Sequence, residues 1–164
     1  MVEKELLTKK FIMVDMDDAC ISTDDMHIIG TQALATCTGV LIYSENVKKA
    51  IVAHISSDYM KTINRIFELV VENKLYRETL KYKIIRGTDR EAHDYYGIID
   101  LLEKYFKDYV PFSDDEISNG VVLDDNTYSN QFAFDALTGK FVSDKVLFGT
   151  DYYAVNQGTD NFKR

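Results

Sequence analysis

The spacing of apolar residues in the first half of the chain predicts three strands followed by a helix. The apolar run Phe11–Val14 predicts the first strand, and the β-rich stretches Val40–Tyr43 and Ala50–Ile55 predict the other two. Only a short polar link that contains Asn46 separates the last two, so we expect them to form an antiparallel hairpin. From Asp58 to Leu75, apolar residues recur at the three- and four-residue spacing of an amphipathic helix.

The second half of the chain predicts one more strand, a second helix and then a series of short strands. Residues 80–84 alternate between apolar and polar, which is typical of a strand, and Glu91–Lys107 again has helical spacing. The short strands are expected at Val121–Leu123, Gln131–Phe134, Phe141–Val142 and Lys145–Phe148. Thr138-Gly139 supplies a turn between the middle two.

This order of elements predicts an α/β fold, namely a single layered domain of mixed, mostly antiparallel β-sheets with two main helices on the outside. The 164 residues match the usual size of one domain. A single proline and the lack of a Gly/Ser-rich linker give no sign of a domain boundary. We therefore expect one folded domain over residues 1–149 and a polar, loosely held tail over residues 150–164.

The formal net charge of −8 restricts the partners that the chain is expected to bind. Acidic residues gather in two places, which we interpret as solvated loops. They are Asp15, Asp17, Asp18, Asp24 and Asp25, and then Asp114, Asp115 and Glu116. Because an acidic surface repels the phosphate backbone, we expect no nucleic-acid partner.

The apolar runs, the N-terminal segment and the cysteines of the chain bear on the cellular compartment that we expect for it. No apolar run reaches the ~18 residues of a membrane-spanning helix, so we expect no membrane insertion. The charged segment Met1–Lys10 lacks the apolar core of a signal peptide, which favours a cytoplasmic protein. Secretion by a route that needs no such signal stays open. The two cysteines, Cys20 and Cys37, are too few for a disulfide framework, and a reducing compartment would keep both as thiols.

Most sequence signatures of catalysis or cofactor binding are missing. The chain has no phosphate-binding loop, no dinucleotide glycine motif, no Gly-x-Ser-x-Gly elbow and no His-Glu-x-x-His. The acidic residues lack the spacing of a helix-loop-helix calcium site. His27, His54 and His93 are scattered, and the two cysteines are too far apart for a zinc knuckle. The sequence therefore predicts neither a metal site nor a cofactor.

Cys37 and His54 are the residues with the best context for chemistry. Cys37 comes just before the predicted strand Val40–Tyr43, and its small neighbours leave room for a substrate chain. In the predicted hairpin, His54 lies in the strand that returns past the start of the first, so we expect it beside Cys37. A base within ~3 Å is what a cysteine nucleophile needs, and an ion pair with a protonated histidine lowers the pKa of a thiol. Spacing alone leaves open that both are ordinary core residues, as we expect for Cys20.

These residues resemble the pattern of the chemoreceptor glutamine deamidases, the CheD family, which is itself similar to the deamidase domain of the cytotoxic necrotizing factor toxins. In that pattern a threonine and five further residues precede the catalytic cysteine, and a strand pair then leads to the catalytic histidine. Thr31, Cys37 and His54 match these positions. The segment Phe134–Lys140 also resembles the family's late Tyr-Asn-x-x-Thr-Gly-Lys hairpin, and the resemblance extends over about residues 10 to 148.

The resemblance implies a cysteine-dependent protein-glutamine deamidase, an amidohydrolase whose catalytic domain spans residues 1–149. In this reading Cys37 is the nucleophile, His54 is the base and Thr31 orients the imidazole. Backbone amides near Cys37 would hold the oxyanion. The implied partners are a protein substrate that bears a glutamine and a regulatory protein, and the implied reaction needs no cofactor.

The chain departs from the family pattern in loops that contact the substrate or a regulatory partner in the family. Ala35-Thr36 stands in place of Gly-Ser before the cysteine, Ile55–Asp58 in place of a Met-Leu-Pro loop after the histidine, and Asp125–Thr127 in place of Gly-Gly-Asn. Three alternatives therefore stay open. They are an effector toxin that deamidates a host protein, a transglutaminase in which an amine replaces water, and a catalytically inactive, CheD-like binding module.

Overall fold

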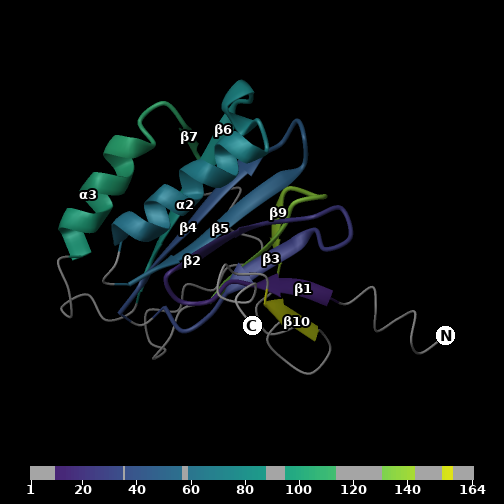
Figure 1. Ribbon diagram of the computed structural model, residues 1–164, viewed down its shortest axis with the longest axis horizontal. Coiled ribbons are helices and arrows are strands. Elements are labelled where there is room, and N and C mark those ends of the chain that lie inside the picture. The colour runs from purple at the N-terminus through teal and green to yellow at the C-terminus, as the bar shows by residue number, and fades with distance from the viewer. Residues whose placement is uncertain are drawn as a thin grey trace.

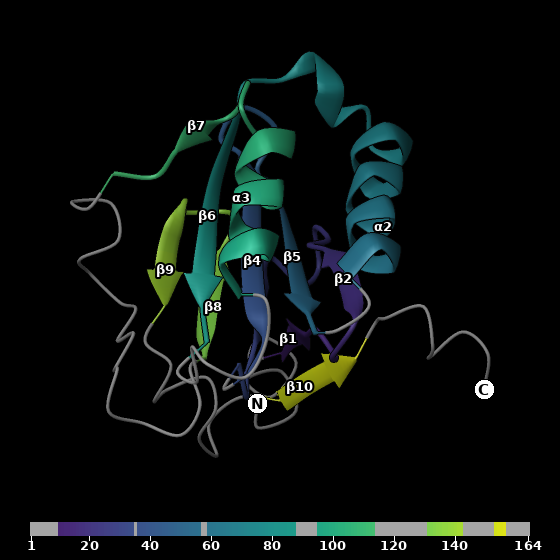
Figure 2. The same ribbon diagram turned by 90° about the vertical axis from the view of Figure 1, so that its left-hand side faces the viewer.

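Two β-sheets stack face to face, and two α-helices cover the outer face of one of them (Figure 1, Figure 2). The structure is a computed structural model that describes residues 10–34, 36–56, 59–87, 95–113, 131–142 and 153–156. These residues form a single α/β domain of mostly antiparallel strands, which confirms the predicted fold class.

The helix-covered sheet, called sheet B here, has the predicted hairpin at its centre. β4 (Thr38–Ser44) and β5 (Lys49–Ile55) pair antiparallel along their whole length, so the hairpin prediction is confirmed. The spatial order of the strands is β2 (Asp18–Ile21), β5, β4, β6 (Leu80–Arg86) and β7 (Val110–Pro111). Neighbouring strands are antiparallel except for β6 and β7, which are parallel.

The second sheet, called sheet A, mixes parallel and antiparallel pairing. Its spatial order is β10 (Tyr153–Asn156), β1 (Lys10–Met13), β3 (Ile28–Thr31), β8 (Phe132–Asp135) and β9 (Lys140–Val142). β1 is parallel to both of its neighbours, whereas β8 is antiparallel to β3 and to β9. Gly139 closes the predicted β8–β9 turn with a φ of 70°, a left-handed conformation that glycine adopts without steric cost.

Apolar side chains from the facing surfaces of the two sheets form the main core. Every second residue along a strand points into this layer, because successive side chains in a strand alternate between faces. Large members of the layer are Ile12, Ile29, Leu41, Phe132 and Phe134. Tyr43 packs edge-on against Phe134, with ring centroids 4.7 Å apart, and donates its hydroxyl to the Ala136 carbonyl at 2.9 Å. This hydrogen bond joins sheet B to the end of β8 in sheet A.

Helices cover the outer face of sheet B, where α2 (Tyr59–Glu72) and α3 (Tyr95–Tyr105) lie beside each other and the short helix η1 (Leu75–Arg77) follows α2 (Figure 2). The buried residues of α2 are Thr62, Ile63, Ile66, Leu69 and Val70. Met60 and Val71 are among the apolar residues from which this helix was predicted, yet they are 40% and 64% exposed. Thr62 and Leu69 are buried against the sheet instead. No described helix is long and apolar enough to cross a membrane.

Strands β2 and β3 were not expected from the pattern of apolar residues, and both border the candidate site. The interpretation of Asp18 as part of a solvated loop is wrong, since this residue lies in β2 and is 3% exposed. Its Oδ1 accepts a hydrogen bond from the Ala19 amide at 2.8 Å. β2 is only four residues long and begins with a charged residue, so it lacks the alternation that reveals a strand.

The expectation of a loosely held tail over residues 150–164 is wrong for Tyr153–Asn156, which forms β10 and pairs in parallel with β1. Strand pairing satisfies backbone groups and does not need an apolar segment, so composition is a poor guide here. The predicted strands Val121–Leu123 and Lys145–Phe148 lie outside the described residues. The same is true of the start of the predicted second helix and of the second acidic cluster.

Candidate active site

The β4–β5 hairpin places Cys37 and His54 at the same end of sheet B. The register pairs Gly39 with His54, and Cys37 lies two residues before Gly39, at the entry to β4. Both side chains are buried, each 3% exposed, on the face of sheet B that meets sheet A. A Cβ atom on Gly39 would come within 2.9 Å of the Phe132 ring and 3.1 Å of Leu34. Glycine at this position therefore lets the two sheets approach closely beside the site.

Thr31 reaches His54 from the opposite sheet. The Thr31 hydroxyl lies 2.7 Å from Nδ1 of His54 and donates to the Val14 carbonyl at 2.8 Å. A hydroxyl has a single proton, so both contacts form only if the Nδ1–H donates to Thr31 Oγ1. This leaves the lone pair on Nε2 of the neutral imidazole, which is the tautomer that a general base requires.

The Nε2 atom of His54 is buried and has no hydrogen-bond partner among the described residues. Buried polar atoms in native proteins are usually paired, and an unpaired one marks a place where a ligand, a water or a reacting group is accommodated. The side chain is thus held at one nitrogen and free at the other, on the face that it shares with Cys37.

Burial sets the protonation states of the two groups at rest. It lowers the pKa of His54 to about 4, an effect that the carboxylate of Asp17 partly opposes. Burial also raises the pKa of the Cys37 thiol; the contact with Thr36 lowers that pKa and the Asp17 charge raises it. Both shifts favour the neutral forms of the two side chains, so the expected thiolate–imidazolium ion pair stays a prediction.

A turn before β4 is closed by the backbone amide of Cys37, which is one of the expected oxyanion donors. The backbone amide of Cys37 donates to the Leu34 carbonyl at 3.2 Å. Leu34 itself is fully buried, and Ala33 adopts a φ of 60°, which a residue other than glycine rarely does. The Cys37 amide can turn toward an oxyanion only after this bond opens, so the expectation that backbone amides near Cys37 hold the oxyanion stays a prediction.

Asp17 and Ser56 are neighbours of the site that the sequence reasoning did not assign to it. The Asp17 amide donates to the His54 carbonyl at 2.7 Å. The Asp17 carboxylate accepts hydrogen bonds from the Ser56 amide at 2.9 Å and from the Ser56 hydroxyl at 2.6 Å. In the sequence, Asp17 was one of several clustered acids, and nothing local distinguished it from its solvated neighbours.

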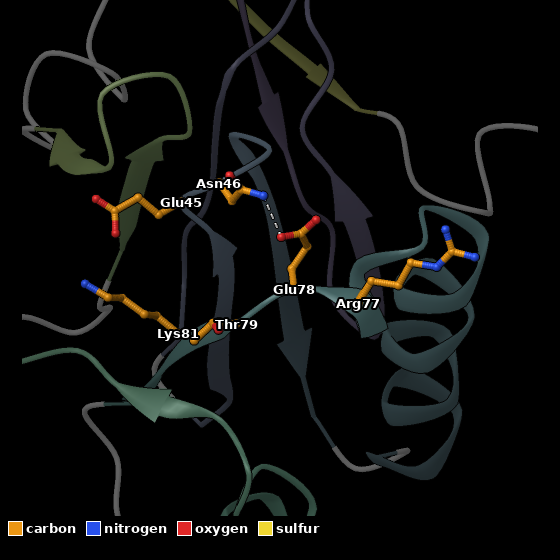
Figure 3. Close-up of a pocket in the computed structure, with 6 residues that line it drawn as sticks. All are labelled: Glu45, Asn46, Arg77, Glu78, Thr79 and Lys81. Atoms are coloured by element: carbon orange, nitrogen blue, oxygen red, sulfur yellow. Dashed lines mark hydrogen bonds between the residues drawn. The ribbon is translucent and has the colours of Figure 1, made fainter.

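A cavity lined by charged residues lies elsewhere. It has a volume of about 590 Å³ and is lined by Glu45, Asn46, Arg77, Glu78, Thr79 and Lys81 (Figure 3). These residues surround the β4–β5 turn and the start of β6, whereas Cys37 stands at the opposite end of β4. Both signs of charge line the cavity, and the Asn46 amide donates to the Glu78 carboxylate at 2.8 Å (Figure 3). It is not part of the thiol–imidazole site.

The other histidines are not brought to this site. His27 pairs with Asp135, with 2.7 Å between Nδ1 and Oδ1, and His93 lies outside the described residues. Cys20 is buried in β2 within the core. In the part of the chain that the structure describes, no three His, Cys, Asp or Glu side chains are grouped closely enough to hold a metal ion.

Comparison with known proteins adds no assignment. No protein-family model matches the chain, and no curated protein sequence matches it. The resemblance to the chemoreceptor deamidases thus stays a prediction that depends on Thr31, Cys37 and His54, and the site is interpreted from its own geometry.

We predict that Cys37 is alkylated faster than Cys20. Burial, with a smaller contribution from Asp18, raises the pKa of Cys20 to about 12, so almost none of it is thiolate near neutral pH. At about pH 8, iodoacetamide should modify Cys37 at least about tenfold faster. Timed quenching followed by peptide mapping gives both rates, and denatured protein, in which the two rates should be similar, is the control. Faster labelling of Cys20 would contradict the site assignment.

We also predict a pH-dependent contribution of His54 to stability. The pKa of His54 is about 4 in the folded protein, below its ordinary value of 6.5, so between these values the unfolded chain binds more protons. Stability is fully present above about pH 6.5 and decreases as the pH falls toward 4, by about 3 kcal/mol in total from this residue. Urea unfolding of the wild type and of His54→Gln should diverge in this window. Parallel pH profiles would show that the imidazole is not held neutral by burial.

Proposed function

We propose that the chain is a cysteine-dependent protein-glutamine deamidase, which hydrolyses the side-chain amide of a glutamine in another protein to glutamate and ammonia. The observation that supports this most is the hydrogen bond from His54 Nδ1 to Thr31, which leaves Nε2 unpaired beside the entry to β4 where Cys37 stands. A nucleophile, a base and an orienting third residue are the parts that acyl transfer needs.

In the first half of the reaction, Nε2 of His54 accepts the proton of the Cys37 thiol as the sulfur attacks the carboxamide carbon. The tetrahedral intermediate carries its negative charge on the former carbonyl oxygen, which backbone amides are suited to stabilise. His54 then donates the proton to the amide nitrogen, the C–N bond breaks and ammonia leaves. A thioester between Cys37 and the substrate remains.

In the second half, water attacks the thioester carbon and gives a proton to Nε2 of His54. The C–S bond breaks, and the sulfur recovers the proton from His54. The product is a glutamate side chain, so one turnover adds a negative charge to the substrate protein. Such a charge can change the conformation or the contacts of the modified protein.

The depth of the thiol favours a side-chain amide as the substrate. Cys37 is 3% exposed, and its backbone amide closes a turn with the Leu34 carbonyl. A glutamine side chain is a narrow, unbranched chain that ends in a carboxamide, so it can enter where a main-chain peptide bond with its flanking residues cannot. Binding must open the turn, which would also free the Cys37 amide, and loop movement of this kind is common on binding.

The same burial is the specific observation that favours a second candidate, the inactive CheD-like binding module. In that reading Cys37 is a small core residue and the Thr31–His54 hydrogen bond only joins the two sheets. The remaining alternatives, a host-directed effector and a transglutaminase, share the proposed chemistry and differ in the substrate protein or in the acceptor. Supplying a primary amine in the assay separates hydrolysis from transamidation.

We predict that Cys37→Ala abolishes deamidation while Cys20→Ala does not. The two cysteines are nearly equally buried, at 3% and 4% exposure, so each substitution should cost a similar amount of stability, about 1–2 kcal/mol. Mass spectrometry of a panel of glutamine-bearing proteins, including chemoreceptor cytoplasmic domains, detects conversion of the amide to the acid. Equal activity of the two variants, or no conversion of any glutamine by the wild type, would favour the binding module.

We predict further that Thr31→Val lowers turnover by about 10²-fold, whereas Thr31→Ser retains most of it. Valine keeps the shape of the side chain but removes the oxygen that accepts from the imidazole Nδ1–H, so the ring loses its fixed orientation and tautomer. Serine keeps that oxygen. Steady-state rates and thermal midpoints should be measured on both variants. If both lose activity equally, packing at this position matters and the hydroxyl does not.

A further inference from the structure

Asp17 forms hydrogen bonds to His54, the residue that carries the imidazole, and to Ser56. It lies in the turn between β1 and β2, where its amide donates to the His54 carbonyl at 2.7 Å. Its carboxylate accepts from the Ser56 amide and hydroxyl, at 2.9 and 2.6 Å, two residues further along the chain. Main chain and side chain of Asp17 thus both hold the chain on the C-terminal side of His54, at the end of β5.

The conformation of Asp17 indicates that these contacts define its position. Its φ of 59° lies in the left-handed region, where aspartate is tolerated better than most residues but glycine is favoured. Three hydrogen bonds to β5 and the residue after it offset that cost. A carboxylate held in this way keeps a fixed distance from the imidazole, in contrast to the freely solvated acid that the sequence suggested.

The charge of this carboxylate acts on both members of the candidate pair. Burial has the largest effect on the pKa of His54, which it lowers, and Asp17 has the next largest, which raises that pKa. For the Cys37 thiol, burial and the Thr36 contact have larger effects than Asp17, which again raises the pKa. The other groups around the imidazole are the Thr31 hydroxyl on β3 and Asp18, which lies opposite His54 in the β2–β5 register.

We propose that Asp17, fixed by its hydrogen bonds to Ser56 and to the His54 carbonyl, is a positioning residue of this site whose carboxylate charge favours the protonated forms of both Cys37 and His54. This role rests on the proposed function, in which the imidazole must accept a proton in each half of the reaction. A nearby negative charge favours the protonated imidazole and disfavours the thiolate. At rest the thiol therefore stays protonated and protected from chance oxidation, and when substrate is bound His54 is a stronger base than burial alone would allow.

Because the charge raises the pKa of both groups, its removal has an unusual signature, namely a more reactive thiol together with a weaker base. Asp17→Asn keeps an oxygen that can accept from the Ser56 amide and loses the charge. We expect iodoacetamide to modify Cys37 several-fold faster in this variant, while the midpoint of the His54 ring-proton titration falls and deamidation slows several-fold. Loss of a merely structural contact would not accelerate alkylation and at the same time weaken the base.

Two further variants make the test decisive. Asp25→Asn removes a single exposed carboxylate from another loop and should change neither the alkylation rate nor the titration. Ser56→Ala removes one donor to Asp17 and keeps its charge, so it should give smaller changes in the same directions, and it serves if Asp17→Asn unfolds. Circular dichroism melts on all three variants separate global unfolding from local effects.

Neither alkylation nor titration needs a substrate, so the two proposals can fail separately. The expected shifts without any deamidation would reject the enzyme and retain the role of Asp17. Active deamidation with an unchanged alkylation rate and an unchanged His54 midpoint in both Asp17→Asn and Ser56→Ala would overturn the role of Asp17 alone.

Discussion

A buried chain of hydrogen bonds, from the His54 imidazole through Thr31 to the Val14 carbonyl, is the constraint on which the candidate site depends. Apart from the Tyr43–Ala136 hydrogen bond, the core cluster between the sheets is apolar, and a satisfied buried polar network helps to specify one arrangement of such a core. A shift of one residue in β5 would turn the imidazole to the helix-covered face and leave the Thr31 hydroxyl without this partner. An unsatisfied buried donor or acceptor costs about 1–3 kcal/mol, so the chain selects one alignment of the two sheets. The same bond fixes the histidine tautomer.

Burial strengthens the hydrogen bonds that fix this geometry, and it also disfavours the charged forms that the chemistry needs. A dry site strengthens each hydrogen bond and removes competing water, but it disfavours the charged forms of both a thiol and an imidazole. Both pKa shifts therefore favour the neutral forms of the pair, and the Cys37 side chain is buried. In the proposed reaction we expect the proton to move only when an electrophile is in place, because the charge that forms is passed directly to the substrate oxygen. Burial is thus the common cause of the low exposure of the thiol and of the raised pKa that lowers its reactivity.

The sequence contained enough to predict the centre of sheet B and not its edges. The β4–β5 hairpin could be predicted because two apolar runs flank a short polar link, and that hairpin alone places Cys37 near His54. The strand β3 could not be predicted from local pattern, since its pairing partners β1 and β8 are separated from it by up to about a hundred residues. Thr31 was therefore reached by resemblance, while its contact with the imidazole is a property of how the sheets stack. Asp18 was misjudged because a charged residue gives no sign that a strand will bury it.

The loop after His54 shows how a departure from a sequence pattern becomes intelligible once partners are known. In the sequence, Ser56 only marked a difference from the Met-Leu-Pro loop of the chemoreceptor deamidases. In the structure its amide and hydroxyl both donate to Asp17, and the Asp17 amide donates back to His54. A proline has no amide hydrogen, and an apolar side chain has no hydroxyl, so neither could hold a carboxylate in this way. The serine and the aspartate thus form one unit, and replacing either should leave the other without its function at the end of β5.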